Sequence, residues 1–307
     1  MARPYRQLID IGDRAVCVRV RGSGPTVVLE AGGVGAAGEG TTGTYGDLEE
    51  RLASFATVLT YDRAGSGCSD GPAHRDVAAM ADDLAAVIHA AGCPTPVVVV
   101  GWTLGGLVAE MFAVRHPDKV AGLVLLNPAE MPIESRRGRY LVLAYGLAYV
   151  LAFNVLRTLG VFRTQAGRKL LLRRAAAAGV GQDVLDYMEH FLVRPLRARW
   201  SYVPVLPQLF GGYARQTAAA VRAATSLPNG PVRVLVPQVR QVRRRRLGRW
   251  VEGLDVAHRK LAQRFPQGEL IIVDQAGYYF PIARPDVVIE TVRDVLGLDS
   301  ETQITTT

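Results

Sequence analysis

The segment 97–112, VVVVGWTLGGLVAEMF, constrains the fold of this chain more than any other stretch. Four valines form a short apolar run typical of a buried strand, and the residues from Leu104 onward have the pattern of a helix. Gly101 and Gly105 flank the connection, and glycine lets a strand and a helix pack closely around a strained residue. The segment therefore predicts a sharp strand–turn–helix unit that presents Thr103 at its apex.

Other apolar runs alternate with helical stretches on both sides of this unit. We expect a hairpin in residues 6–22, joined through Gly12-Asp13, and buried strands at 26–33, 56–61, 96–101, 120–128, 231–237 and 268–274. We expect helices at 76–92, from Thr103 to about Pro117, around 250–265 and at 285–297. Continuous apolar strands joined by helices are typical of a parallel sheet covered on both faces. The predicted fold class is therefore α/β.

The alternation is interrupted between residues 130 and 228, a stretch rich in Arg, Leu and Ala. We interpret it as a helical cap inserted over the end of the sheet. The chain then divides into core segments at 1–129 and 229–298, the cap at 130–228, and a disordered tail at 299–307.

Within the predicted cap, residues 140–156 form a run without charged side chains. A membrane-spanning helix needs about 20 strongly apolar residues, and this run is shorter and contains Gly146 and Asn154. We interpret it as a cap helix that lines an apolar pocket. Contact with a membrane surface and a true span are the alternatives.

Charge and cysteine usage narrow the possible partners. The net charge is +8, but 33 of the 36 basic residues are arginine, a usage that also accompanies GC-rich genomes. No aromatic platform or binding motif accompanies the arginine run at 242–248, so we predict no nucleic-acid partner.

The three cysteines, Cys17, Cys68 and Cys93, show no C-x-x-C spacing, which predicts neither a zinc site nor a disulfide. With no apolar leader at the N-terminus, a reducing cytoplasm is the expected location.

Several segments together carry a resemblance to a known family. VVLEAGG, YDRAGSGCSD, VVGWTLGGLVAEMFAVRHPDKVAGLVLLNPA and DQAGYYFPIARPDVV resemble, in order and spacing, the segments of the α/β-hydrolase fold. The resemblance implies a mostly parallel sheet flanked by helices, with a helical cap. It also implies an oxyanion hole made by the backbone N–H of Leu104 and by a second N–H around Gly33 and Val34.

The chain departs from that family at each position of the usual Ser-His-Asp triad. Thr103 stands where the family has serine, and Tyr278 stands where it has histidine. The loop PQVRQV carries Arg240 and no carboxylate, and the alternate acid position is Asn127. A phenol with a pKa of about 10 is a poor base at neutral pH, so we interpret the triad as lost. Of the five histidines, only His190 in the predicted cap could reach the site.

These residues lead to a hypothesis of a non-hydrolytic enzyme. We expect a lyase, eliminase or cyclase that acts on a lipophilic, possibly acetylated metabolite of polyketide type, with Thr103 orienting the substrate and Tyr278 donating a hydrogen bond. Divergent relatives that eliminate acetate from tetronates in antibiotic pathways provide an analogy at the level of the fold. The alternatives are an esterase or acyltransferase with Thr103 as nucleophile, and a non-catalytic small-molecule binding protein.

Other side chains are candidates for the pocket wall, and no cofactor or metal is predicted. These candidates are Trp102, Asn127, Glu130, Tyr202 and Arg240. The run GGVGAAG at 32–38, with Asp62 after the next strand, matches the outline of a dinucleotide-binding fingerprint. The following EGTTGTYG is a poor helix start, however, and phosphate binding depends on a helix N-terminus. We therefore favour the hydrolase fold.

Overall fold

The structure is a computed structural model of the chain. It describes residues 6–32, 45–74, 76–129, 212–238, 255–274 and 276–298, together with residues 181–187 and individual positions between 148 and 173.

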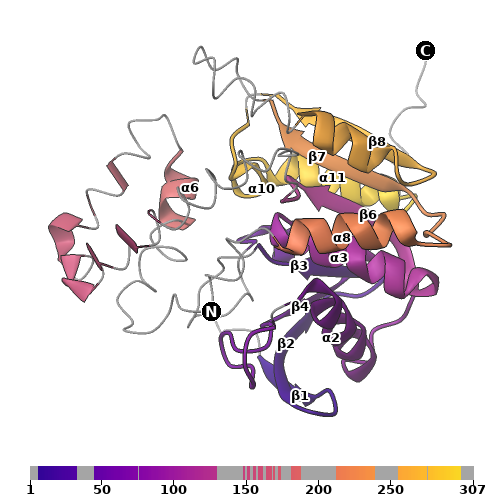
Figure 1. Cartoon of the computed structure of the whole chain (residues 1–307), viewed down its shortest axis with the longest axis horizontal. Coiled ribbons are helices and arrows are strands. Elements are labelled where there is room, and N and C mark those ends of the chain that lie inside the picture. The colour runs from indigo at the N-terminus through magenta and orange to yellow at the C-terminus, as the bar shows by residue number, and fades with distance from the viewer. Residues whose placement is uncertain are drawn as a thin grey trace.

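A single twisted sheet of eight strands forms the centre of the described part of the chain (Figure 1). The strands are β1 (Gln7–Asp10), β2 (Ala15–Arg21), β3 (Thr26–Glu30), β4 (Thr57–Tyr61), β5 (Val97–Trp102), β6 (Val120–Leu126), β7 (Val232–Pro237) and β8 (Gly268–Val273). They lie in the order β1-β2-β4-β3-β5-β6-β7-β8. The hairpin β1–β2 is antiparallel and joins β4 in antiparallel fashion, whereas the remaining neighbours are parallel. The mostly parallel α/β sheet and the N-terminal hairpin are confirmed.

Helices cover both faces of this sheet, as the apolar strands predict. The helices are α1 (Leu48–Leu52), α2 (Val77–Ala90), α3 (Leu104–Arg115), α6 (Gln182–Tyr187), α8 (Gly212–Ala223), α10 (Phe280–Ala283) and α11 (Pro285–Val295), with a 3-10 turn η1 (Pro117–Lys119). One apolar cluster joins the sheet to α2, α3 and the helix at 255–262, and a second joins it to α1 and α11. Every residue of β3 and β5 is buried because both strands lie between these layers.

Local signals in the sequence fix where the helix before the turn begins and ends. The Asp76 carboxylate accepts a hydrogen bond from the Ala79 backbone N–H at 2.8 Å, which satisfies one of the free donors of the first turn of α2. Gly92 follows the helix at φ 64°, the left-handed conformation that commonly ends a helix. The chain therefore enters β5 in the direction that the parallel sheet requires.

Parts of the predicted cap are described, and they occupy different places relative to the sheet. α6 contacts α10, the short helix that follows the last strand, and in Figure 1 it lies to the left of the sheet. α8, at the end of the same interval, packs against α3. Leu151 and Val155, from the uncharged run, are each more than half exposed. Within the described residues, no helix is long and apolar enough to cross a membrane.

Cys17 and Cys68 form a disulfide, so the prediction that the cysteines are unrelated is wrong. Cys17 lies on β2, and Cys68 lies in the loop after β4, the strand that pairs with β2. Their separation of 51 residues hides this proximity, because it arises only when β4 joins the sheet beside β2. The two sulfurs and Asp62 are the one cluster of three possible metal ligands among the described residues, and the sulfurs are bonded to each other. Cys93 is buried and free.

Candidate active site

Thr103 lies in a strained turn between β5 and α3. Its φ is 52°, a value that costs a β-branched residue about 1–2 kcal/mol. Three backbone hydrogen bonds hold it in place. The Thr103 N–H donates to the Leu126 carbonyl at 3.0 Å, and the Thr103 carbonyl accepts from the N–H groups of Gly106 and Ala129 at 3.1 Å. The predicted turn is therefore present, and it holds Thr103 at the carboxyl edge of the sheet.

The flanking glycines are required by close contacts between backbone segments. A Cβ atom on Gly101 would lie 2.4 Å from the Gly105 carbonyl oxygen. A Cβ atom on Gly105 would lie 2.0 Å from the carbonyl oxygen of Glu30, on the neighbouring strand β3. Helix α3 thus begins directly against β3. This close contact is possible because Gly101 and Gly105 have no side chains.

Tyr278 contacts Thr103 from the other end of the chain. It precedes α10, and its phenol oxygen lies close enough to the Thr103 hydroxyl for the two groups to interact. Burial raises the pKa of the Tyr278 phenol, and the Thr103 hydroxyl, which can donate to the phenol oxygen, only partly opposes this. Tyr278 as a whole is 49% exposed, so it borders accessible space. At neutral pH this residue is therefore a neutral hydrogen-bond donor.

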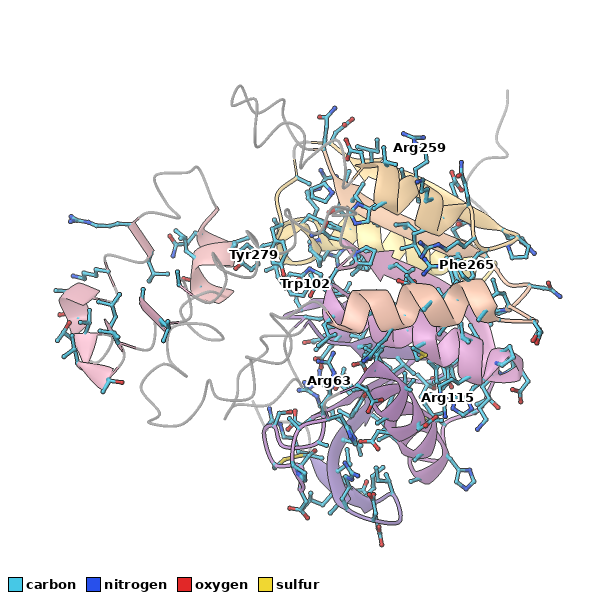
Figure 2. All side chains as sticks on the ribbon, in the orientation of Figure 1. Arg63, Trp102, Arg115, Arg259, Phe265 and Tyr279 are labelled. Carbon is cyan, nitrogen blue, oxygen red and sulfur yellow. A yellow bond between two sulfur atoms is a disulfide. The ribbon has the colours of Figure 1, made fainter. Side chains whose placement is uncertain are left out.

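Aromatic side chains form the support behind this pair. The Trp102 ring centroid lies 5.9 Å from that of Tyr278 and 6.1 Å from those of Tyr45 and Tyr279. Trp102 is almost fully buried, and Figure 2 shows it beside Tyr279 at the edge of the sheet. Of the two interpretations open for Trp102, packing therefore describes it better than exposure to a ligand. The cluster holds the Tyr278 ring in place.

The backbone that follows β3 passes next to the Thr103 hydroxyl. A Cβ atom on Gly32 would lie 2.9 Å from Thr103 Oγ1, so only glycine leaves this atom free. Leu104, whose N–H is the first predicted oxyanion donor, is the first residue of α3. The second donor was assigned to Gly33 or Val34, and both lie outside the described residues.

The other candidates for the pocket wall are placed only in part. Asn127 follows β6 with φ 43°, and its N–H donates to the Leu235 carbonyl at 2.7 Å. It is thus the second residue other than glycine with a positive φ in the described part, beside Thr103. Glu130, Tyr202 and Arg240 lie outside the described residues, as does His190.

Three histidines in the described part of the chain contact groups other than Thr103. His74 Nε2 lies 2.6 Å from the Asp83 carboxylate, and His116 Nε2 lies 3.3 Å from that of Asp82. His258 is buried and donates from Nε2 to the Pro128 carbonyl at 3.1 Å. Since Ala129, the next residue, donates to Thr103, His258 supports the turn from behind.

His258 makes stability depend on pH in a direction that its environment fixes. Burial lowers its pKa, and the bond to Pro128 only partly opposes this. The unfolded chain then binds the proton more readily than the folded one, so this contribution is complete above about pH 6.5 and is lost as the pH falls. We expect the wild type to lose up to about 1.4 kcal/mol more per pH unit than His258→Gln. Urea unfolding of both proteins at pH 7.5, 6 and 5 measures this difference, and parallel pH profiles would contradict the assignment.

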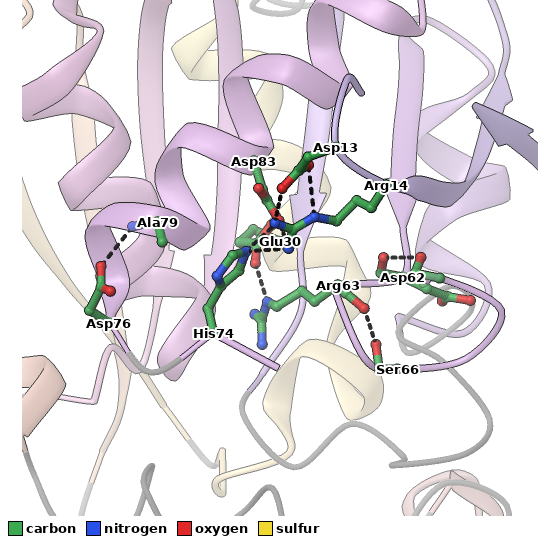
Figure 3. A network of polar contacts seen from close by, with 11 residues as sticks. Asp13, Arg14, Glu30, Asp62, Arg63, Ser66, His74, Asp76, Ala79 and Asp83 are labelled. Atoms are coloured by element: carbon green, nitrogen blue, oxygen red, sulfur yellow. Dashed lines mark hydrogen bonds and ion pairs between the residues drawn. The ribbon is translucent and has the colours of Figure 1, made fainter. Parts of the chain in front are cut away.

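Sequence reasoning missed Glu30 and Tyr45 near this site. Glu30 is fully buried at the end of β3 and pairs with Arg63, which lies in the loop after β4 (Figure 3). The Tyr45 hydroxyl donates to the Glu30 carbonyl at 2.8 Å. The available signal was a carboxylate that ends an otherwise apolar strand, because a buried charge needs a partner.

Comparison with known proteins agrees with this fold. The family described as alpha/beta hydrolase fold matches residues 25–175. The chain has the α/β-hydrolase fold. A thermophilic esterase from Thermogutta terrifontis has the same fold, with a TM-score of 0.65 and 20% identity over 96% of this chain and 98% of that one.

Two curated proteins match parts of the chain. The pimeloyl-[acyl-carrier protein] methyl ester esterase of Chromobacterium violaceum is 41% identical over 109 residues, which cover 36% of this chain and 39% of that enzyme. Polyketide synthase ThaQ of Burkholderia thailandensis is 36% identical over 116 residues, which cover 38% of this chain and 5% of the synthase. The chain thus spans less than half the length of these curated relatives.

Proposed function

We propose that this protein is an enzyme that acts on an acylated, lipophilic small molecule and releases the acyl group as a carboxylate by elimination. The observation that carries the proposal is the approach of the Tyr278 phenol to Thr103 at the strained turn, where the Tyr278 ring packs on Trp102. Burial raises the pKa of this phenol. A phenol that holds its proton this firmly cannot remove the proton of a hydroxyl nucleophile at neutral pH. It can donate a hydrogen bond to an oxygen that gains negative charge.

Such a pair of neutral donors suits a substrate that supplies its own negative charge. A carbon acid next to a carbonyl group loses its proton to solvent and becomes an enolate. The enolate electron pair then forms a C=C bond, the C–O bond to the carboxylate breaks, and that electron pair leaves with the carboxylate. In this proposal Tyr278 donates to the departing carboxylate and Thr103 orients it, while the N–H of Leu104 and the loop at Gly33 and Val34 stabilise the charged oxygen.

The second candidate is ester hydrolysis or acyl transfer with Thr103 as nucleophile. The printed name of the Chromobacterium violaceum relative, a methyl ester esterase, favours it. The strained turn also presents Thr103 in the place where the superfamily has its nucleophile. This candidate requires a base outside the described residues, and His190 and Glu130 are the side chains to test.

Heavy-oxygen water separates the two reactions. We would offer the protein acetylated β-hydroxycarbonyl compounds, among them an acetylated tetronate, together with p-nitrophenyl esters of short and medium chain length. Elimination yields an alkene and an unlabelled carboxylate, since the bond from carboxylate oxygen to the substrate carbon breaks. Hydrolysis places the heavy oxygen in the product carboxylate. Mass spectrometry of both products decides between them.

Substitutions identify which side chains act in the reaction that is observed. For elimination we expect Tyr278→Phe to lower kcat by about a hundredfold, the effect of losing one donor to a developing charge. Tyr279→Phe is the matched control, because it removes a phenol oxygen from the same aromatic cluster, and it should retain nearly full activity. Labelled carboxylate, with covalent labelling by a fluorophosphonate that Thr103→Ala abolishes and Thr103→Ser retains, would establish the esterase instead. Ligand binding without any turnover would indicate a binding protein.

A further inference from the structure

Arg63 and Glu30 form a buried ion pair at the carboxyl end of the sheet. Arg63 Nε lies 2.6 Å from Glu30 Oε1, and the two side chains are 12% and 1% exposed. Burial alone would lower the pKa of the Arg63 guanidinium, but the Glu30 carboxylate together with the phenols of Tyr61 and Tyr45 outweighs burial, and the pKa is raised. Burial and the charge of Glu30 raise the pKa of the nearby Tyr61 phenol. The guanidinium is therefore charged, and the ion pair with Glu30 holds its direction.

The same guanidinium also holds the backbone that leaves β3. It donates from Nη2 to the Ala31 carbonyl and from Nη1 to the Gly32 carbonyl, the latter at 3.4 Å. In a trans peptide the carbonyl and the N–H of one plane point in opposite directions. A donor that fixes the direction of the Ala31 carbonyl therefore also fixes the direction of the Gly32 N–H.

This backbone is the part of the chain that touches the Thr103 hydroxyl. Glu30 is the register partner of Gly101, two residues before Thr103, and Gly32 lies against Thr103 Oγ1. The loop that carries the predicted oxyanion donors begins at the next residue, Gly33. A rotation of the peptide between Ala31 and Gly32 would turn the Gly32 N–H and move the backbone next to Thr103 Oγ1.

Stability alone is a poor explanation for this pair. Burying two charges costs several kcal/mol per ion before pairing, and apolar side chains of similar volume often serve stability equally well. The guanidinium instead donates to three acceptors, namely the Glu30 carboxylate and the backbone carbonyls of Ala31 and Gly32 next to the site. Its planar fork gives those contacts a fixed geometry.

We propose that Arg63, oriented by Glu30, is a positioning residue that sets the direction of the Ala31 and Gly32 carbonyls and of the Gly32 N–H beside the Thr103 hydroxyl, where a charged oxygen of the substrate would bind. The inference rests on the proposed function in one respect, namely that this backbone stabilises a charged oxygen of the substrate. Arg63 itself does not touch the reacting atoms.

Hydrogen exchange tests this role without any substrate. We would compare wild type with Arg63→Lys, which keeps the charge and loses the fork, and follow the peptide covering residues 28–36. Arg115→Lys is the matched control, because Arg115 also binds a carboxylate through two nitrogens, at 2.7 Å, but on the protein surface. We expect amide exchange in this peptide to accelerate about tenfold in Arg63→Lys and to remain unchanged in Arg115→Lys. If Arg63→Lys fails to fold, Glu30→Gln provides the same comparison with Arg63 present.

Turnover provides the second readout. For the reaction that the wild type performs, Arg63→Lys should lower kcat by roughly tenfold to a hundredfold with little change in KM, because the groups that act in the transition state are misdirected. A role in stability alone would lower Tm and leave exchange at 28–36 and kcat unchanged well below Tm, and that result would overturn the proposal. If the wild type turns over none of the substrates, the proposed function fails, and the exchange result still decides whether Arg63 orders the loop.

Discussion

Replacing Gly105 by alanine is expected to destabilise the protein by about 3 kcal/mol or more. Gly105 is the second residue of α3, where helix propensity alone predicts that alanine stabilises by about 1 kcal/mol. The close backbone contacts at Gly105 reverse the sign of the expected change in the free energy of unfolding. A new Cβ would lie 2.0 Å from the Glu30 carbonyl oxygen and 2.7 Å from that of Ala31, so backbone of the central strand would have to move. The free energy of unfolding from urea titration measures the effect.

Gly277→Ala is the control for this substitution. A Cβ there meets nothing within 4 Å, and the φ of Gly277 lies outside the left-handed region, so we expect a change of less than about 1 kcal/mol. A Gly105→Ala protein as stable as wild type would show that α3 and β3 lie further apart than described. The same displacement would affect the site, because the clashing carbonyls belong to residues held by Tyr45 and Arg63.

The sequence predicts the sheet well because its information is local. The apolar runs that become β3 and β5 are buried on both faces, and continuous apolar strands have few other solutions than a parallel sheet between helices. The approach of Thr103 and Tyr278 also follows from local signals. Both residues come after strands whose carboxyl ends meet at one edge of the sheet, so residues far apart in sequence converge there.

What sequence reasoning misses depends on pairs of residues that the sheet order brings together. Glu30 pairs with Arg63, which follows the neighbouring strand β4. Their spacing in the sequence does not predict this ion pair. Trp102 precedes the turn residue and could equally have faced a ligand, but three tyrosines from two distant segments, Tyr45 and the adjacent Tyr278 and Tyr279, surround it. Such contacts are properties of the assembled layers, whereas the strand and helix patterns are properties of short segments.

Loss of the Cys17–Cys68 disulfide should be the second large effect on stability. The bond closes a loop with a sequence separation of 51 residues, and restricting the unfolded chain in this way contributes about 4 kcal/mol. The loop that it closes includes Arg63 and the turn after β4. Ser69, next to Cys68, also holds this turn, since its hydroxyl accepts from the Cys17 N–H at 2.9 Å. We expect Cys17→Ser and treatment with a reductant to lower the free energy of unfolding by similar amounts, measured by urea titration.

Alkylation of the unfolded protein, followed by mass spectrometry, shows whether the bond is present. One thiol, that of Cys93, should react before reduction and three after it, and reductant should not further destabilise Cys17→Ser. Three reactive thiols in protein purified under oxidising conditions would show that the two sulfurs are neighbours without being bonded, and the expected cytoplasmic location would then stand. A bond already present in protein isolated from its own cells, with thiols blocked at lysis, would argue for an oxidising compartment, because such bonds seldom persist in a reducing cytosol. In that case the loop that carries Arg63 matures only where disulfides form, and the protein acquires its final site geometry there.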